Sequence, residues 1–501
     1  MSTIRAQAVR FSIVNYTATI LAAISTLWIY PLELTAYGLA QFLVSFAMLC
    51  IPVATFGTLT LTVKFFPEYK ALGLHKAYLF NVLVLGFGSL AIALLLAVLI
   101  NRPVLKFLEF LSFDAHLIAK HKYTIVVLIA IMLYNNVLLI HTSNYNKIAI
   151  PSAFQNLLPK LILPLLIIGV YLEVFEVAAF ARLWVLSYCL ASMGLTFYLW
   201  KIDGLDLQPK LHFFHKDRIW KLLGYSSYMS AGTLGSMLAG RIDLIMVGTL
   251  IGLKEVGIYS IALFIGNVLL IPASAVWQIA SPVISEAFAQ HNWERITEVY
   301  KKTSTNLLII GVFIYFFILG SLDAVLTLSP NYRNISMAVS LFAIIGITKM
   351  IEMGASVNQY ILNYSPKFRS TLLFVAIMAI TNIVLNYFLI DSLGILGAAL
   401  STCITTYLYQ LIKCIYIEKQ YGIHPLSNMT PRILLLFLII MLYYLLLPDL
   451  ASPIVQAIIY CVGLVILYVA GIRLLGIRSD VTETVEHHFT QILRHIRVKV
   501  S

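Results

Sequence analysis

The chain has 501 residues, of which 60% are hydrophobic and 11% are charged, and its mean hydropathy is +0.91. A soluble domain carries about 25% charged residues, because most of its shell faces water. These values therefore exclude a secreted, cytosolic or disordered protein. The formal net charge of +12 fits basic residues held at the cytoplasmic face of a membrane protein better than a nucleic-acid site, so no nucleic-acid partner is expected.

Apolar runs interrupted by charges, Pro and Gly predict an all-α polytopic membrane protein. At roughly 20 residues per span, about 300 apolar residues are enough for roughly 14 helices. The first run follows Arg5 and Arg10 and is too long for a signal-peptide core, so we expect it to stay as a helix. The predicted spans are 11–30, 36–62, 77–100, 123–143, 151–172, 178–200, 222–250, 256–280, 304–323, 335–360, 370–390, 393–415, 430–448 and 452–473.

The distribution of Lys and Arg predicts the orientation. With the N-terminus in the cytoplasm, the inner segments carry 25 basic residues and the outer segments carry seven, while Arg241 and Lys349 fall inside spans. Basic residues concentrate on the cytoplasmic side, so both termini are predicted to lie there. The segments 283–302 and 479–500 are predicted to form amphipathic surface helices, either at the headgroups or docked on the protein.

A weak internal repeat divides the chain. Gly38 and Gly257 open similar segments, and Asn144 and Asn363 end corresponding spans, both pairs being 219 residues apart. Six spans per repeat is an even number, so the repeats should be parallel and related by an axis along the membrane normal. The predicted parts are two six-helix lobes at 1–210 and 211–420, helices 13 and 14 in 421–475, and a cytoplasmic amphipathic tail at 476–501.

Ionisable residues inside spans are the first candidates for a site. A charge at a helix centre costs about 2.5–3.5 kcal/mol on the insertion scale, so Arg241, Asp243, Lys349 and Glu352 should pair or line a wet cavity. The repeat offset places them opposite residues without charge, which favours cavity groups. The alternative is buried pairs that fix helix packing, in particular Asp243 with Lys349. The uncharged counterparts are Ala22, Ile24, Ala130 and Leu133.

Neutral polar residues add to this candidate cavity, because hydroxyls and amides suit hydroxyl-rich ligands such as sugars. Each of them alone also fits a hydrogen bond between helices. The sequence contains no P-loop, no nucleotide-binding glycine motif and no metal-spaced His/Cys cluster, so no cofactor, metal or catalytic residue is predicted. The neutral candidates are Asn15, Gln41, Asn135, Asn136, Tyr225 and Tyr228.

Three blocks carry a resemblance to a known family. The chain resembles the polysaccharide-transport branch, the Wzx-type O-antigen flippases, of the multidrug/oligosaccharidyl-lipid/polysaccharide exporter superfamily. The match in pattern covers about residues 5–475. The blocks are Tyr37-Gly38-Leu39-Ala40 through Phe65-Phe66-Pro67-Glu68-Tyr69, Arg241-Ile242-Asp243 through Glu255-Val256-Gly257-Ile258-Tyr259, and Leu393-Gly394-Ile395-Leu396-Gly397-Ala398-Ala399.

The resemblance implies a bacterial inner-membrane flippase with two lobes around a central cavity. Its substrate would be a polyprenyl-diphosphate oligosaccharide of O-antigen, lipopolysaccharide or other polysaccharide synthesis, moved to the periplasmic leaflet by alternating access. Membrane lipids, a polysaccharide polymerase and other assembly proteins are the implied partners. Arg241 and Lys349 are suited to compensate the diphosphate, and Asp243 and Glu352 to hold these cations or a coupling ion.

Two alternatives remain open from the sequence. A drug or cation antiporter of the same superfamily would need an intramembrane carboxylate, for which Asp243 or Glu352 is available. The predicted first span, however, has no acidic residue. A polytopic polymerase, ligase or glycosyltransferase would need catalytic residues in outer loops, and the outer segments here are short.

Overall fold

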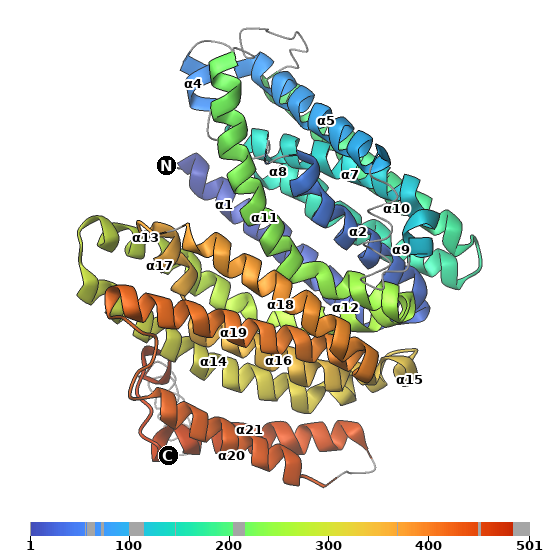
Figure 1. Cartoon of the computed structure of the whole chain (residues 1–501). Helices are drawn as coiled ribbons and strands as arrows, with labels where there is room; N and C mark the ends of the chain where they lie inside the picture. The colour runs from blue at the N-terminus through green and yellow to red at the C-terminus, as the bar shows by residue number, and fades with distance from the viewer. Residues whose placement is uncertain are drawn as a thin grey trace. The chain divides into compact units, whose positions relative to one another are not determined.

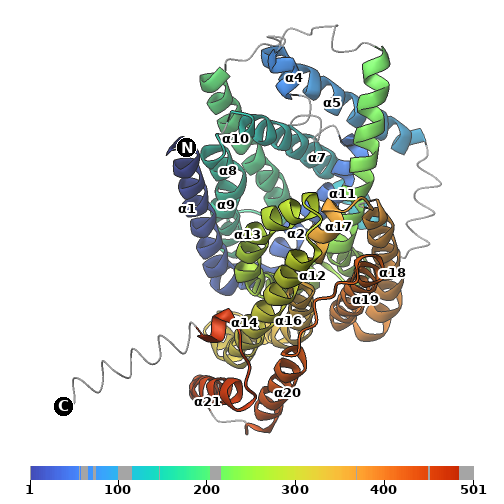
Figure 2. The same ribbon diagram turned by 90° about the vertical axis from the view of Figure 1, so that its left-hand side faces the viewer.

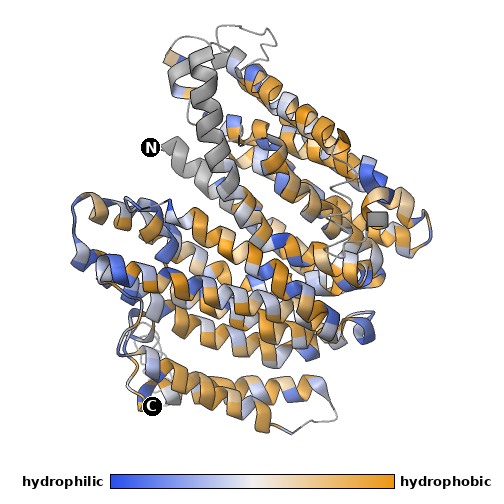
Figure 3. Ribbon diagram, viewed as in Figure 1, coloured by the Kyte–Doolittle hydropathy of each residue, from blue (hydrophilic) through white to orange (hydrophobic). Residues whose placement is uncertain are grey.

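The structure is a computed structural model, and it describes residues 2–55, 57, 66–71, 75–99, 115–145, 147–203, 216–367, 369–448 and 452–483. Every regular element in these ranges is a helix (Figure 1). Apolar residues run along most of the helix lengths, while polar residues gather at many of the helix ends and connections (Figure 3). The predicted all-α membrane fold is therefore confirmed.

The predicted number of 14 spans is not confirmed. The described ranges contain ten helices long and apolar enough to cross a membrane, or twelve if two bent pairs each count as one span. At the N-terminal end, most of the two predicted spans 11–30 and 36–62 falls within one continuous helical path of 43 residues, 13–55. The π-turn Ser25–Ile29 and the 3-10 turn Tyr30–Glu33 keep this path helical through the predicted loop. Thr430–Leu446 is a shorter apolar helix.

The chain packs as two compact units, residues 1–260 with 382–398 and residues 261–381 with 399–501. The lobe boundaries at 210 and 420 stay a prediction. In the first unit, α2 packs on α5, α7 and α11, and α7 packs on α10. Its helices are α1 (Ser2–Ile24), α2 (Leu34–Thr55), α4 (Phe66–Ala71), α5 (His75–Leu99), α7 (Ala115–Ser143), α8 (Ala149–Ser152), α9 (Leu158–Tyr171), α10 (Val177–Asp203) and α11 (Lys216–Leu250).

The two glycines of the predicted repeat meet in a reciprocal contact between α2 and the start of α12 (Leu253–Val268). A Cβ at Gly38 would overlap the carbonyl oxygen of Leu253, and a Cβ at Gly257 would overlap the carbonyl oxygen of Leu34. Leu34 and Leu253 are themselves 219 residues apart. The equivalent residues of the two repeats therefore exchange places in this contact, which is the pattern that a local two-fold relation produces.

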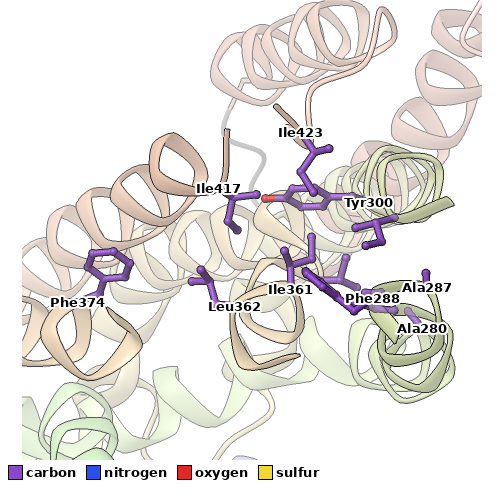
Figure 4. Close-up of a cluster of buried hydrophobic side chains, with 12 residues drawn as sticks. Ala280, Ala287, Phe288, Tyr300, Ile361, Leu362, Phe374, Ile417 and Ile423 are labelled. Carbon is purple, nitrogen blue, oxygen red and sulfur yellow. The ribbon is translucent and has the colours of Figure 1, made fainter. Parts of the chain in front are cut away.

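In the second unit, α14 packs on α13, α16, α20 and α21, and α20 packs on α21 (Figure 2). A cluster of buried apolar side chains joins α13, α14, α17, α18 and α19 (Figure 4). The helices are α13 (Leu270–Ala289), α14 (Trp293–Thr327), α15 (Tyr332–Ile335), α16 (Met337–Ala355), α17 (Asn358–Tyr364), α18 (Ser370–Leu393, shared with the first unit), α19 (Ile395–Tyr421), α20 (Thr430–Leu446) and α21 (Pro453–Leu474).

The prediction of one amphipathic helix over 283–302 is wrong. α13 ends at Ala289 and α14 begins at Trp293. The Asn292 side chain accepts a hydrogen bond from the backbone N–H of Arg295 at 3.0 Å, which caps the new helix, and His291 has a φ of 55°. Asn at the cap position therefore starts a second helix where the apolar spacing alone suggested continuation. Of the predicted surface helix 479–500, residues 484–500 lie outside the described part of the chain.

Candidate functional site

Arg241 lies in the second half of α11, beside α2. Its guanidinium donates a long hydrogen bond of 3.5 Å to the Ser45 hydroxyl. The phenols of Tyr37 and Tyr188 and the carboxylate of Asp243 are close enough to act on it electrostatically. A guanidinium has five N–H donors, and this is the hydrogen bond that Arg241 makes among the described residues. Its other N–H groups have no acceptor among the described residues.

Asp243 is two residues further along α11 and is buried, with 3% of its surface exposed. Its Oδ2 accepts a hydrogen bond of 2.9 Å from the hydroxyl of Tyr259 on α12. Burial and this bond make Asp243 part of the packing between α11 and α12. Its predicted alternative partner, Lys349, belongs to the other unit, so that pairing stays a prediction.

Asn135 and Asn136 lie on α7 and have different surroundings. Asn135 is buried, donates to the carbonyl of Tyr188 at 3.3 Å and accepts from the Ser192 hydroxyl at 2.7 Å. Asn136 accepts from Gln155 at 2.7 Å. It also lines a pocket of about 270 Å³ together with residues of α2 and α11. Asn135 thus joins α7 to α10 next to the Tyr188 that faces Arg241, while Asn136 reaches a separate pocket.

The other neutral candidates have fewer described contacts with the surroundings of Arg241. The Asn15 amide donates to the carbonyl of Phe11 at 3.0 Å, one turn earlier in its own helix. Gln41 interacts with the phenol of Tyr37, and this places it in the surroundings of Arg241. Tyr225 and Tyr228 lie on α11, and their side chains lie outside the described part of the chain. Among the neutral candidates, Gln41 and Asn135 are linked to Arg241 through a neighbouring tyrosine.

In the second unit, Lys349 and Glu352 lie one turn apart on α16. The ammonium of Lys349 donates to the Glu352 carboxylate at 3.1 Å. Their spacing of three residues allows this pair on one helix face. The pair therefore brings the two opposite charges together within α16.

Glu352 also lines a pocket of about 410 Å³ in the second unit, and sequence reasoning missed a second charged residue that lines it. Lys413 on α19 is 2% exposed. Its ammonium donates to Gln359 at 3.2 Å and lies 4.0 Å from the ring centre of Tyr409. The pocket is lined by Trp277, Glu352, Ser356, Asn358, Gln359, Tyr360, Asn363, Met378, Thr406, Tyr409, Gln410 and Lys413.

A sequence signal for Lys413 existed. It falls two residues before the end of the predicted span 393–415, at the end that the distribution of Lys and Arg places on the cytoplasmic side. A lysine near a span end commonly extends to the headgroups, but here its side chain is covered by the protein. Tyr37 and Tyr188, the phenols near Arg241, were missed because tyrosines are frequent among the apolar residues of these spans.

The chain matches two family profiles. The profile described as polysaccharide biosynthesis protein matches residues 11–288, more than half of the chain, and the MatE profile matches residues 231–388. Among curated proteins, the chain is similar to the probable flippase AglR of Haloferax volcanii, 23% identical over 208 residues, and to the uncharacterized membrane protein MJ1068 of Methanocaldococcus jannaschii, 24% identical over 282 residues. These matches cover 41% and 53% of this chain, and the chain spans about half the length of each relative, 43% and 53%.

Solved structures of membrane transporters share the fold of this chain. The lipid II flippase MurJ in an inward closed conformation matches with a TM-score of 0.66 and 14% identity over 93% of this chain and 99% of that one. An inward-facing multidrug resistance MATE family transporter matches with a TM-score of 0.61 and 16% identity over 83% of this chain and 98% of that one. The chain therefore belongs to the polysaccharide biosynthesis protein family and is a multi-pass membrane protein with the fold seen in the MurJ flippase and in MATE family transporters.

Proposed function

We propose that the chain is a flippase for a polyprenyl-diphosphate-linked oligosaccharide, moving it from the cytoplasmic to the periplasmic leaflet of a bacterial inner membrane by alternating access. In this proposal both termini lie in the cytoplasm, as the distribution of Lys and Arg predicts. A polysaccharide polymerase and other assembly proteins would act with it, on O-antigen or another polysaccharide.

The observation that carries the proposal is that Arg241 is charged and has few hydrogen-bond partners among the described residues. It is a permanent cation in an apolar helix, and among the described residues its guanidinium makes one long hydrogen bond, to a neutral hydroxyl. Guanidinium groups bind phosphate oxygens through parallel N–H···O bonds. A diphosphate that enters this region would find several unused donors, while Asp243 is engaged by Tyr259.

The surroundings of Arg241 suit the rest of such a ligand. Gln41, Tyr37 and Tyr188 supply amide and phenol groups near the guanidinium. In the second unit, Lys349 is a further cation whose distance to Glu352 allows exchange of that partner for a phosphate oxygen. A hydrated glycan and a diphosphate do not cross about 30 Å of hydrocarbon unaided, so polar groups at membrane depth are what a flippase requires.

The test is leaflet exchange in proteoliposomes. A fluorescent polyprenyl-diphosphate oligosaccharide is incorporated, and an external quencher reports the fraction in the outer leaflet over time. We expect faster exchange than in protein-free liposomes. Unchanged exchange with several different glycans would contradict the proposal.

A drug or cation antiporter is the second candidate, because the MatE profile matches residues 231–388. In that case Asp243 or Glu352 would trade a cation for a proton or sodium ion. Proton-driven uptake of a cationic dye into the same proteoliposomes, without exchange of the lipid-linked glycan, would favour this candidate.

A further inference from the structure

The buried ammonium of Lys413 is a cation without a matching anion in the described part of the chain. Its described contacts are the neutral oxygen of Gln359 and the face of the Tyr409 ring. No described carboxylate forms an ion pair with it. An ammonium has three N–H donors, and a buried charge is costly unless it is paired. Lys413 therefore brings unused N–H donors and an unpaired positive charge to the pocket that it lines.

The neighbouring charges do not remove this excess. Glu352 acts electrostatically on Lys413, but its carboxylate is already paired with Lys349 at 3.1 Å. With Lys413 in its ammonium form, these three side chains together carry one net positive charge. An anionic group that enters the pocket would neutralise this positive charge, whereas a neutral ligand would leave the charge uncompensated.

Amide side chains hold the pocket in a defined arrangement. Gln359 accepts from both Lys413 and the Tyr409 hydroxyl and donates to Asn363 at 2.9 Å. Asn358 donates to Gln410 at 2.9 Å. Because the oxygens of Asn363 and Gln410 are used in these bonds, their amide N–H groups remain as donors for a ligand.

The pocket also has aromatic walls on a rigid base. Trp277, Tyr360 and Tyr409 line it and pack against the apolar cluster that includes Phe288, Ile361 and Ile417 (Figure 4). Its volume of about 410 Å³ lies within the range of small-molecule sites, about 300–1,000 Å³. Aromatic faces beside amides fit the apolar face and the hydroxyl edge of a sugar ring.

The geometry points to a binding site for an acidic sugar, a pyranose that carries a carboxylate, with the carboxylate on Lys413 and the hydroxyls on the amides of Asn363 and Gln410. This ligand uses the cation, the amides and the aromatic walls together. An inorganic anion would use the cation but leave the aromatic walls unused. The inference rests on the proposed function and extends it, since it states that the transported glycan contains acidic sugars.

Direct binding is measured first, by saturation-transfer difference NMR on the purified full chain in detergent, with glucuronate and glucose as probes. We expect signals from glucuronate, at least tenfold weaker binding of glucose, and little competition by acetate or inorganic phosphate. Equal binding of the two sugars, or competition by phosphate at the same concentration as glucuronate, would overturn the site as an acidic-sugar site. These measurements need only the unaltered protein.

Variants then assign the effect to Lys413. Lys413→Met should weaken glucuronate binding at least tenfold, and Lys413→Arg should retain part of it. The control is Lys419→Met, an exposed lysine on the same helix, which should bind glucuronate as the unaltered chain does. Unchanged binding by a folded Lys413→Met would contradict the inference.

Leaflet exchange separates this inference from the proposed function. A polyprenyl-diphosphate glycan that contains a hexuronate should exchange faster than its neutral counterpart, and Lys413→Met should remove the difference. If both glycans exchange equally, the inference fails while the flippase function stands. If neither exchanges, the proposed function fails and the NMR binding result decides the pocket separately.

Discussion

The two repeats of the chain are alike where their backbones touch and unlike where they carry charge. Gly38 and Gly257 make the same close approach to a backbone carbonyl, each against the other's repeat. The charged residues have no such counterparts. Arg241, Asp243, Lys349 and Glu352 all lie in the second repeat, and the residues 219 positions earlier are uncharged.

This difference separates what the fold needs from what a particular transporter needs. A helix crossing that leaves no room for a Cβ is a requirement of the backbone, so both repeats keep it. A charge at membrane depth is costly in either repeat, and the first repeat has no charge at the positions equivalent to Arg241, Asp243, Lys349 and Glu352. The charges of the second repeat are therefore the better place to look for function.

The largest effect is expected from breaking the shared contact. Gly257→Val places a branched side chain against the Leu34 carbonyl, and Gly38→Val does the same at Leu253. Each should lower the free energy of unfolding by about 3 kcal/mol, since neither backbone can move away without moving its helix. Melting temperature and monodispersity after purification are the readouts.

The matched control is Gly232→Ala on α11, where no described atom lies within 4 Å of the added Cβ. This variant should melt close to the unaltered protein. If the valine variants at positions 38 and 257 also melt normally, the reciprocal contact is not a requirement of the fold.

The second largest effect is expected at Arg241, whose charge has no counterpart in the first repeat. Arg241→Ala removes the donors proposed to bind the diphosphate, and a charge-assisted hydrogen bond is worth about 1.5–3 kcal/mol. Leaflet exchange of the lipid-linked glycan should fall about tenfold to hundredfold at equal protein amounts. Arg241→Lys should keep part of the rate, because it keeps the charge but not the planar donor pair.

Arg295→Ala is the control for that change, since Arg295 is an exposed arginine paired with Glu298 on α14. Its exchange rate should match that of the unaltered chain. Normal exchange by Arg241→Ala would return Arg241 and Asp243 to the packing interpretation.

A smaller effect is expected at the Lys349–Glu352 pair. Lys349→Glu and Glu352→Lys each place like charges three residues apart on one face of α16 and should lower stability by about 1 kcal/mol. The double reversal restores the pair, so its melting temperature should return toward the original value. If transport stays low in the double variant, Lys349 acts on the substrate; if transport returns with stability, the pair serves packing.

The smallest effect is expected at Asn135. Asn135→Leu removes a buried side chain that bonds to Tyr188 and Ser192, and should lower the free energy of unfolding by about 1–2 kcal/mol. Ser192→Ala removes one of these bonds and should cost less. Thermal unfolding measures both, and an unchanged melting temperature for Asn135→Leu would show that these bonds do not stabilise the packing of α7 on α10.

The class of the protein follows from its amino-acid sequence. Hydropathy is a sum over neighbouring residues, so runs of apolar residues predict membrane helices without knowledge of packing. The offset between Gly38 and Gly257 and the order of the three sequence blocks likewise predicted the repeat and the family. The pairing of Lys349 with Glu352 was within reach too, since both lie on one helix face.

Only the tertiary structure decided which polar groups meet across helices. The partners of Asp243, Asn135 and Lys413 lie on helices 16 to 54 residues away, and no local pattern encodes those distances. The turns at residues 25–33 are helical and partly buried, with Ser25, Thr26, Tyr30 and Pro31 covered by the protein, which local hydropathy does not report. Burial of Lys413 is the clearest case, because whether a lysine near a span end reaches water depends on what the fold packs against it.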